Sequence, residues 1–198
     1  MASAIDPSDR VELDGRRRRS AASREKIVDA MIEITRSGNT SPSAEQVAVK
    51  AGVGRRTVFR LFKDMDSIYS EMTVTIRRRL ATKLAKPARG ETPGDTLEAL
   101  IDRRVLVFED TLPIWVAAAV HRPRSAFLQQ QHREIAQEMR DVLAAHLPGE
   151  AVNDVTRLEA LDLILSVEAW VRLRKDQKCN PEVAANVLKH AALATLNA

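Results

Sequence analysis

Five hydrogen-bond donors gather within a nine-residue segment of the chain: Arg55, Arg56, Thr57, Arg60 and Lys63. On a helix, residues three or four positions apart share a face, so several of these side chains reach one partner together. Arginine and lysine donate to phosphates and to the O6 and N7 atoms of guanine, and a helix of this kind fits the major groove. The segment predicts recognition of nucleic acid by hydrogen bonding. The alternative is a helical hairpin with a solvated basic face.

The residues around this segment predict the elements that hold it. Ser43 and Gln46 have the spacing of a capping box, so a short helix starts there and ends near Ala51. Gly52 stands where the chain needs a positive φ or lacks room for a Cβ atom, and the donor-rich helix follows over residues 55–61. The small Ala48 permits a close crossing of the two helices. Apolar residues then fill the space between the helices and anchor the second one: Val47, Val53, Val58 and Phe62. Together these features predict a helix-turn-helix.

Helical patterns also flank this motif. Ser23 is a predicted N-cap for a helix whose apolar face carries Ile27, Ala30, Met31 and Ile34, and Asp64 is a predicted cap for a helix reaching about Lys83. Residues 1–22 lack apolar periodicity and carry the run Arg16, Arg17, Arg18 and Arg19. We expect a flexible basic arm that enters the minor groove or contacts phosphates. A solubilising tail is the alternative.

The charge distribution separates the two halves of the 198-residue chain. Residues 1–90 hold 19 Lys and Arg against 11 Asp and Glu, a net charge of +8, whereas residues 91–198 hold 12 against 16, a net charge of −4. This asymmetry predicts that only the first half meets a polyanion, for which nucleic acid is favoured over an anionic membrane.

The composition predicts an all-α fold. Alanine, leucine, glutamate and arginine dominate, and no alternating strand pattern occurs. The Pro- and Gly-rich stretch 86–94 marks a break, after which we expect helices over about 95–109, 111–122, 123–147, 154–176 and 181–197. The predicted organisation is the arm at 1–22, a helix-turn-helix domain at 23–85 and a second helical domain at 86–198.

Residues 24–72 resemble the DNA-binding domain of the TetR family of bacterial repressors. The similarity rests on three segments: 27–30 (Ile-Val-Asp-Ala), 47–53 (Val-Ala-x-x-Ala-Gly-Val) and 57–62 (Thr-Val-Phe-Arg-x-Phe). Residues 166–174 are similar to one subgroup of the family, and residues 90–150 match only in helical character. The resemblance implies a homodimer that binds a palindromic operator in double-stranded DNA, and a small-molecule effector that releases the DNA. Its two recognition helices lie about 34–36 Å apart, or a multiple of that distance.

The resemblance also implies roles for single residues. Arg55 and Arg56 face bases or nearby phosphates, and the Thr57 hydroxyl binds a phosphate. Phe59 replaces a tyrosine that commonly contacts phosphate, and Gly54 stands where a serine commonly caps the helix. Met65 occupies the place of a phosphate-binding lysine, for which Lys63 partly substitutes. The full set of DNA-binding candidates is Arg16, Arg17, Arg18, Arg19, Ser43, Gly54, Arg55, Arg56, Thr57, Phe59, Arg60 and Lys63.

Two further residue sets belong to the second domain. Aromatic and polar side chains are candidates to line an effector site, with ordinary core packing as the alternative: Phe108, Trp115, His121, Phe127, Met139, Glu168 and Trp170. Apolar residues at helical spacing, with alanines between them, are candidates for a four-helix dimer interface, with intramolecular packing as the alternative: Leu158, Leu161, Leu165, Val183, Val187 and Leu188.

Enzyme motifs do not emerge from the sequence. His132 and Glu134 match the first part of a zinc deaminase signature, but that site needs two further cysteines and the chain has only Cys179. No glycine-rich phosphate loop, nucleophile elbow or His-Glu-x-x-His sequence is present. We therefore expect no catalytic site, no metal and no cofactor. Because the chain has no secretory leader and no membrane-spanning stretch, we expect a cytoplasmic protein.

Three functions are compatible with these features. The favoured one is a ligand-responsive transcriptional regulator, a repressor in the first instance. The second is a constitutive DNA-binding protein without sequence preference or ligand site. The third is a helical interaction module whose basic face meets an acidic protein.

Overall fold

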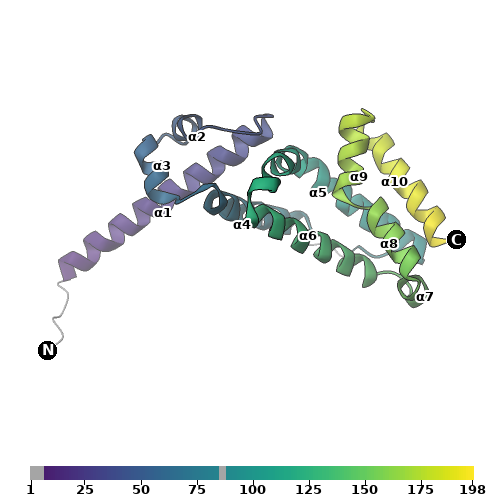
Figure 1. Ribbon diagram of the computed structural model, residues 1–198. Helices are drawn as coiled ribbons and strands as arrows, with labels where there is room; N and C mark the ends of the chain where they lie inside the picture. Colours follow the sequence, from purple (N-terminus) through teal and green to yellow (C-terminus); the bar gives the residue numbers. More distant parts are fainter. Residues whose placement is uncertain (1–6, 85–87) are drawn as a thin grey trace. The chain divides into compact units, whose positions relative to one another are not determined.

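The computed structural model describes residues 7–84 and 88–198, and these residues form helices and connecting turns without a strand. The predicted all-α class is confirmed. The chain divides into two compact units, Met1–Ile76 and Arg77–Ala198 (Figure 1). Sequence reasoning placed the boundary later, between residues 85 and 86. The unit boundary instead falls inside the fourth helix.

The first unit contains α1 (Pro7–Arg36), α2 (Ala44–Ala51), α3 (Arg55–Leu61) and the first part of α4 (Met65–Lys83). Both α2 and α3 pack on α1 and on each other. Ile27, Ala30 and Met31 are buried as predicted, whereas Ile34 is only partly buried and Ile32 takes a place in the core. The rest of this core comes from α2, from α3 with the residue after it, and from α4: Val47, Ala48, Ala51, Val58, Leu61, Phe62, Ile68 and Met72.

The start of α1 corrects a sequence-based prediction. We expected a flexible arm before a helix that begins at Ser23, but α1 begins at Pro7 and includes Arg16–Arg19. Alanine, arginine and glutamate are strong helix formers, and no proline follows Pro7 within the helix, so nothing stops it before Gly38. Residues 1–6 of the predicted arm lie outside the described residues.

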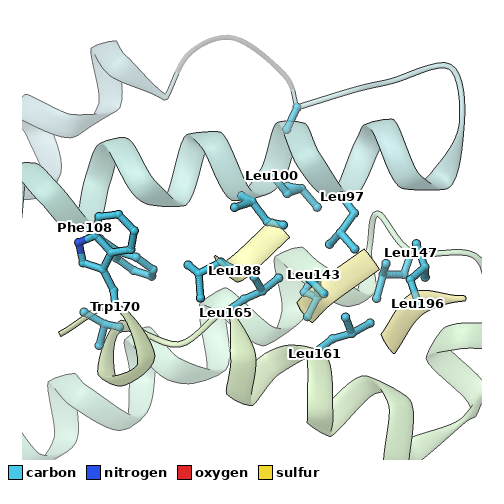
Figure 2. Packing of buried hydrophobic residues seen from close by; sticks show 14 of the residues in the cluster. Leu97, Leu100, Phe108, Leu143, Leu147, Leu161, Leu165, Trp170, Leu188 and Leu196 are labelled. Carbon is cyan, nitrogen blue, oxygen red and sulfur yellow. The ribbon is translucent and has the colours of Figure 1, made fainter. Parts of the chain in front are cut away.

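The second unit contains the end of α4 and the remaining helices. These are α5 (Pro93–His121), the 3-10 turn η1 (Arg122–Arg124), α6 (Ala126–Ala144), α7 (Gly149–Asn153), α8 (Val155–Ile164), α9 (Val167–Val171), the π-helical turn η2 (Arg172–Asp176) and α10 (Pro181–Leu196). Leucines from α5, α6, α8 and α10 meet in its core (Figure 2). Phe108 and Trp170 lie at one end of the same cluster, with ring centroids 6.4 Å apart.

Two predicted helix boundaries in this unit are wrong. We expected a break near residues 110–112, but α5 continues through Pro113. Buried residues before and after the proline, among them Phe108 and Ala117, hold one helix across it and override the local preference. Conversely, the helix expected over 154–176 breaks after Leu165, because the Ser166 hydroxyl accepts a hydrogen bond from the Ala169 amide at 3.2 Å and caps a new helix.

Arg104 is the buried charged residue that joins three helices of this core. From α5, its guanidinium donates hydrogen bonds to the Leu165 carbonyl at 2.8 Å and to the Met139 carbonyl at 2.5 Å. Leu165 is the residue at which α8 ends, so Arg104 satisfies a carbonyl that the helix leaves free. Burial lowers the pKa of Arg104 to about 10, and the nearby Asp162 carboxylate opposes that shift. The side chain therefore remains cationic at neutral pH.

We expect Arg104→Met to lower the free energy of unfolding by about 1–3 kcal/mol, because methionine fills the space but leaves the Leu165 carbonyl at the end of α8 without its donor. Urea denaturation at pH 7 measures this change. Arg103→Met is the matched control on the same helix, since Arg103 donates no hydrogen bond to any residue in the described part of the chain. Equal losses in the two variants would contradict the role of Arg104.

Candidate nucleic-acid interface

The first helix of the predicted motif starts at the expected cap. The Ser43 hydroxyl accepts a hydrogen bond from the Gln46 amide at 3.2 Å, and the Gln46 side chain accepts one from the Ser43 amide at 2.8 Å. The predicted capping box is confirmed. Asn39 donates to the same Gln46 side-chain oxygen at 3.4 Å, which ties the incoming loop to α2. Ser43 itself is an exposed residue.

The turn between α2 and α3 depends on glycine conformation. Gly52 has φ of 64° and ψ of 36°, and its amide donates to the Ala48 and Val49 carbonyls. A Cβ atom added at Gly52 meets nothing within 4 Å, so the backbone conformation and not crowding requires glycine there. Gly54 precedes α3 at φ of −71° and offers no side-chain cap. The predicted loss of a cap hydrogen bond at Gly54 is confirmed.

The third helix has one apolar side and one exposed basic side. Val58 and Leu61 face the core, and Phe62 lies buried directly after the helix. Arg55, Arg56, Arg60 and Lys63 are exposed, and Thr57 is partly buried. Positions 55 and 59 are four residues apart, as are 56 and 60, so these side chains share the outward face of α3, whereas Lys63 lies two residues beyond the end of the helix. The structure therefore brings Arg55, Arg56 and Arg60 together on one exposed face of α3.

The charges of this face are not neutralised inside the protein. None of Arg55, Arg56, Arg60 and Lys63 forms an ion pair with a carboxylate among the described residues. By contrast, Lys50 on α2 pairs with Glu33 on α1 at 2.8 Å. A cluster of exposed, unpaired cations raises the local concentration of polyanions and releases their counterions on contact.

Arg24 is a residue that sequence reasoning missed. Its guanidinium carbon lies 4.7 Å from the Phe62 ring centroid, and its Nε atom is 2.5 Å from the Glu71 carboxylate. One side chain of α1 therefore contacts the residue that ends α3 and a carboxylate of α4. Glu71 is 47 positions away in the chain, so no local pattern could reveal this contact. Arg16–Arg19 lie exposed on the same helix, closer to its start.

The effector-site candidates occupy different parts of the second unit. Phe108 and Trp170 are buried in the main core. The Trp115 and His132 rings meet edge to face with centroids 6.3 Å apart, and the exposed Glu168 carboxylate lies 3.6 Å from His132 Nε2. His121, Phe127 and Met139 are partly buried. The structure thus gathers two of the candidates in the core and two around His132.

His132 is a polar residue near the candidates that has an unusual environment. Its Nδ1 atom is buried without a hydrogen-bond partner, and Arg122 lies 3.9 Å from the Glu168 carboxylate that faces it. The pKa of His132 is lowered, first by burial and then by the positive charge of Arg122, while Glu168 raises it. A neutral imidazole is the favoured state at neutral pH.

The dimer candidates require a correction. Leu158, Leu161, Leu165 and Leu188 are buried in the core of a single chain, so their side chains have no surface left for a partner. Helical periodicity marks a buried face but does not distinguish an intramolecular from an intermolecular contact. Val183 and Val187, one turn apart on α10, remain exposed.

Comparisons with known proteins support the fold. No protein-family model matches the sequence, and no curated protein matches it either. Among solved structures, the chain is similar to a transcriptional regulator from Rhodococcus sp. Rha1, with a TM-score of 0.71 and 22% sequence identity. The match covers 88% of this chain and 96% of that one. This likeness shows that the two chains share one all-helical fold.

The described residues hold neither a membrane-spanning helix nor a cluster of metal ligands. No helix there is long and apolar enough to cross a membrane. No group of three or more histidine, cysteine, aspartate or glutamate side chains in residues 7–84 and 88–198 is placed to hold a metal ion.

We expect Gly52→Ala to destabilise the first unit by about 1–2 kcal/mol, because alanine is strained in the left-handed conformation. Gly54→Ser, two positions later in the chain, is expected to have the opposite effect and to stabilise the first unit. A Cβ at Gly54 lies 3.9 Å from the Thr57 hydroxyl oxygen, so serine fits, caps α3 and adds a few tenths of a kcal/mol. Thermal unfolding of the two variants measures both effects. A stabilising Gly52→Ala would show that the turn does not require glycine.

We also expect stability to fall with pH below 6.5 partly through His132. Its pKa is lowered in the folded chain, so the unfolded chain binds the proton first as the pH drops. This contribution is fully present above pH 6.5 and is lost as the pH falls through the lowered pKa. Urea midpoints of the wild type and His132→Gln between pH 7.5 and 5 measure it. Identical pH dependence in both proteins would rule out His132 as a source.

Proposed function

We propose that the protein is a sequence-specific, DNA-binding transcriptional regulator of the TetR family, and that it acts in the cytoplasm as a repressor without catalytic activity. Its recognition helix is α3. The observation that carries this proposal is the exposed face of Arg55, Arg56, Arg60 and Lys63, which no carboxylate among the described residues neutralises. The fold shared with the Rhodococcus regulator supports the same conclusion.

The length of α3 supports recognition by two copies. A seven-residue helix spans about 10 Å at 1.5 Å per residue and reaches only a few base pairs. A two-fold dimer doubles the contact and reads a palindrome. The exposed Val183 and Val187 on α10 offer apolar area for such a contact. We propose a homodimer that binds a palindromic operator.

The second unit is the proposed site of effector binding. The resemblance supplies this role, and Trp115, His132 and Glu168 provide an aromatic and polar group for it. A small molecule releases DNA only if it binds better to the chain geometry that does not fit the operator. The effector therefore shifts the spacing of the two α3 helices by this difference in affinity.

Selection of bound sequences from a random DNA pool at near-physiological salt tests the proposal. We expect one palindrome, and a loss of affinity for it of about 5- to 150-fold in Arg56→Ala, because a bidentate contact to guanine is worth about 1–3 kcal/mol. Arg124→Ala is the matched control, since Arg124 is an exposed arginine of the second unit. It leaves affinity unchanged.

The alternatives give different results in the same experiment. Binding that weakens with salt and recovers no consensus supports the non-specific DNA-binding protein. Absence of DNA binding at moderate salt supports an acidic protein partner. Either result overturns the proposed regulator.

A further inference from the structure

An aromatic side chain stands among the cations of α3. Phe59 is 59% exposed and lies on the outward face of α3, one turn from Arg55. The apolar residues that hold α3 in place, Val58 and Leu61, lie on the opposite side of the helix. Packing of the first unit therefore gives no reason for phenylalanine at this position. An aromatic side chain beside an arginine is the combination of residue types that is enriched at contact surfaces.

Arg55 is in contact with this ring. Its guanidinium carbon lies 5.6 Å from the Phe59 ring centroid, within the range of a cation–π interaction. The contact limits the conformations of a long side chain, and the exposed guanidinium donates no hydrogen bond to another described residue. Phe59 and Arg55 therefore present one apolar plane and one planar donor group side by side.

The major groove contains a matching pair of groups. The thymine C5-methyl is the apolar group that an unmodified base pair exposes there, and guanine O6 and N7 form the acceptor pair that arginine binds in a bidentate manner. An unmodified cytosine offers no methyl group, and a phosphate offers no apolar surface to a phenyl ring.

We propose that Phe59 packs against a thymine methyl while Arg55 binds the adjacent guanine, so that the pair reads a thymine next to a guanine in each half-site. The inference rests on the proposed function and names the base chemistry that α3 recognises. Phe59 is thus a specificity-determining residue and not a phosphate contact.

Replacing single thymines by uracil in the selected palindrome tests this proposal, because uracil lacks only the methyl group. Removing one buried methyl is expected to weaken binding about four-fold. We expect one such thymine in each half-site, next to a guanine, and about a 15-fold loss when both are replaced. Replacing the adjacent guanine by 7-deazaguanine removes the N7 acceptor and is expected to weaken binding as well.

Variants then assign the effect to the residue. We expect Phe59→Ala to bind DNA with uracil and DNA with thymine at that position equally well. The variant keeps the fold because Phe59 is exposed. Phe59→Leu retains an apolar contact and therefore part of the methyl preference. Val49→Ala is the matched control: Val49 is 73% exposed on α2 and is not part of the pair, so the preference for thymine remains unchanged.

The outcomes separate this inference from the proposed function. A palindrome that tolerates uracil at every thymine overturns the inference but leaves the regulator in place. Equal uracil sensitivity in the wild type and Phe59→Ala also overturns it, because another residue then reads the methyl. Failure to select any consensus overturns the proposed function, and this inference falls with it.

Discussion

The burial of one side of α3 is the constraint on which the candidate interface depends. A helix of seven residues is not stable in water without tertiary contacts. Val58, Leu61 and Phe62 supply those contacts, and the Arg24 guanidinium covers the Phe62 ring while it pairs with Glu71. The basic face points outward because the opposite face is fixed. A substitution that loosens this packing displaces the basic side chains of α3, even though it does not replace any of them.

The elements of the motif were predictable because they rest on local chemistry. A capping box needs only Ser43 and Gln46 at the right spacing, and a left-handed turn needs only Gly52. The buried Val47 and Val58 and the exposed arginines follow from helical periodicity. Each of these signals lies within a few residues, so the sequence contains it directly.

The remaining features depend on contacts between distant residues. Arg24 binds Glu71, and the buried Arg104 donates a hydrogen bond to the Leu165 carbonyl. Both contacts join positions far apart in the chain. The continuity of α5 through Pro113 reflects burial on both sides of the proline, which opposes its local preference. The leucines predicted for a dimer interface lie instead in one chain's core, because the two environments produce the same apolar spacing. The start of α1 at Pro7 was not predicted, because the sequence there lacks an apolar period even though its residues have strong helix propensity.

The central claim is that α3 reads bases in the major groove from two symmetric positions. Methylation interference on the selected palindrome tests it most directly, because dimethyl sulfate modifies guanine N7 on the floor of that groove. The account predicts two groups of interfering guanines about one helical turn apart, or a multiple of it, and their loss in Arg56→Ala. Interference from phosphate ethylation alone, with every methylated guanine tolerated, would contradict it.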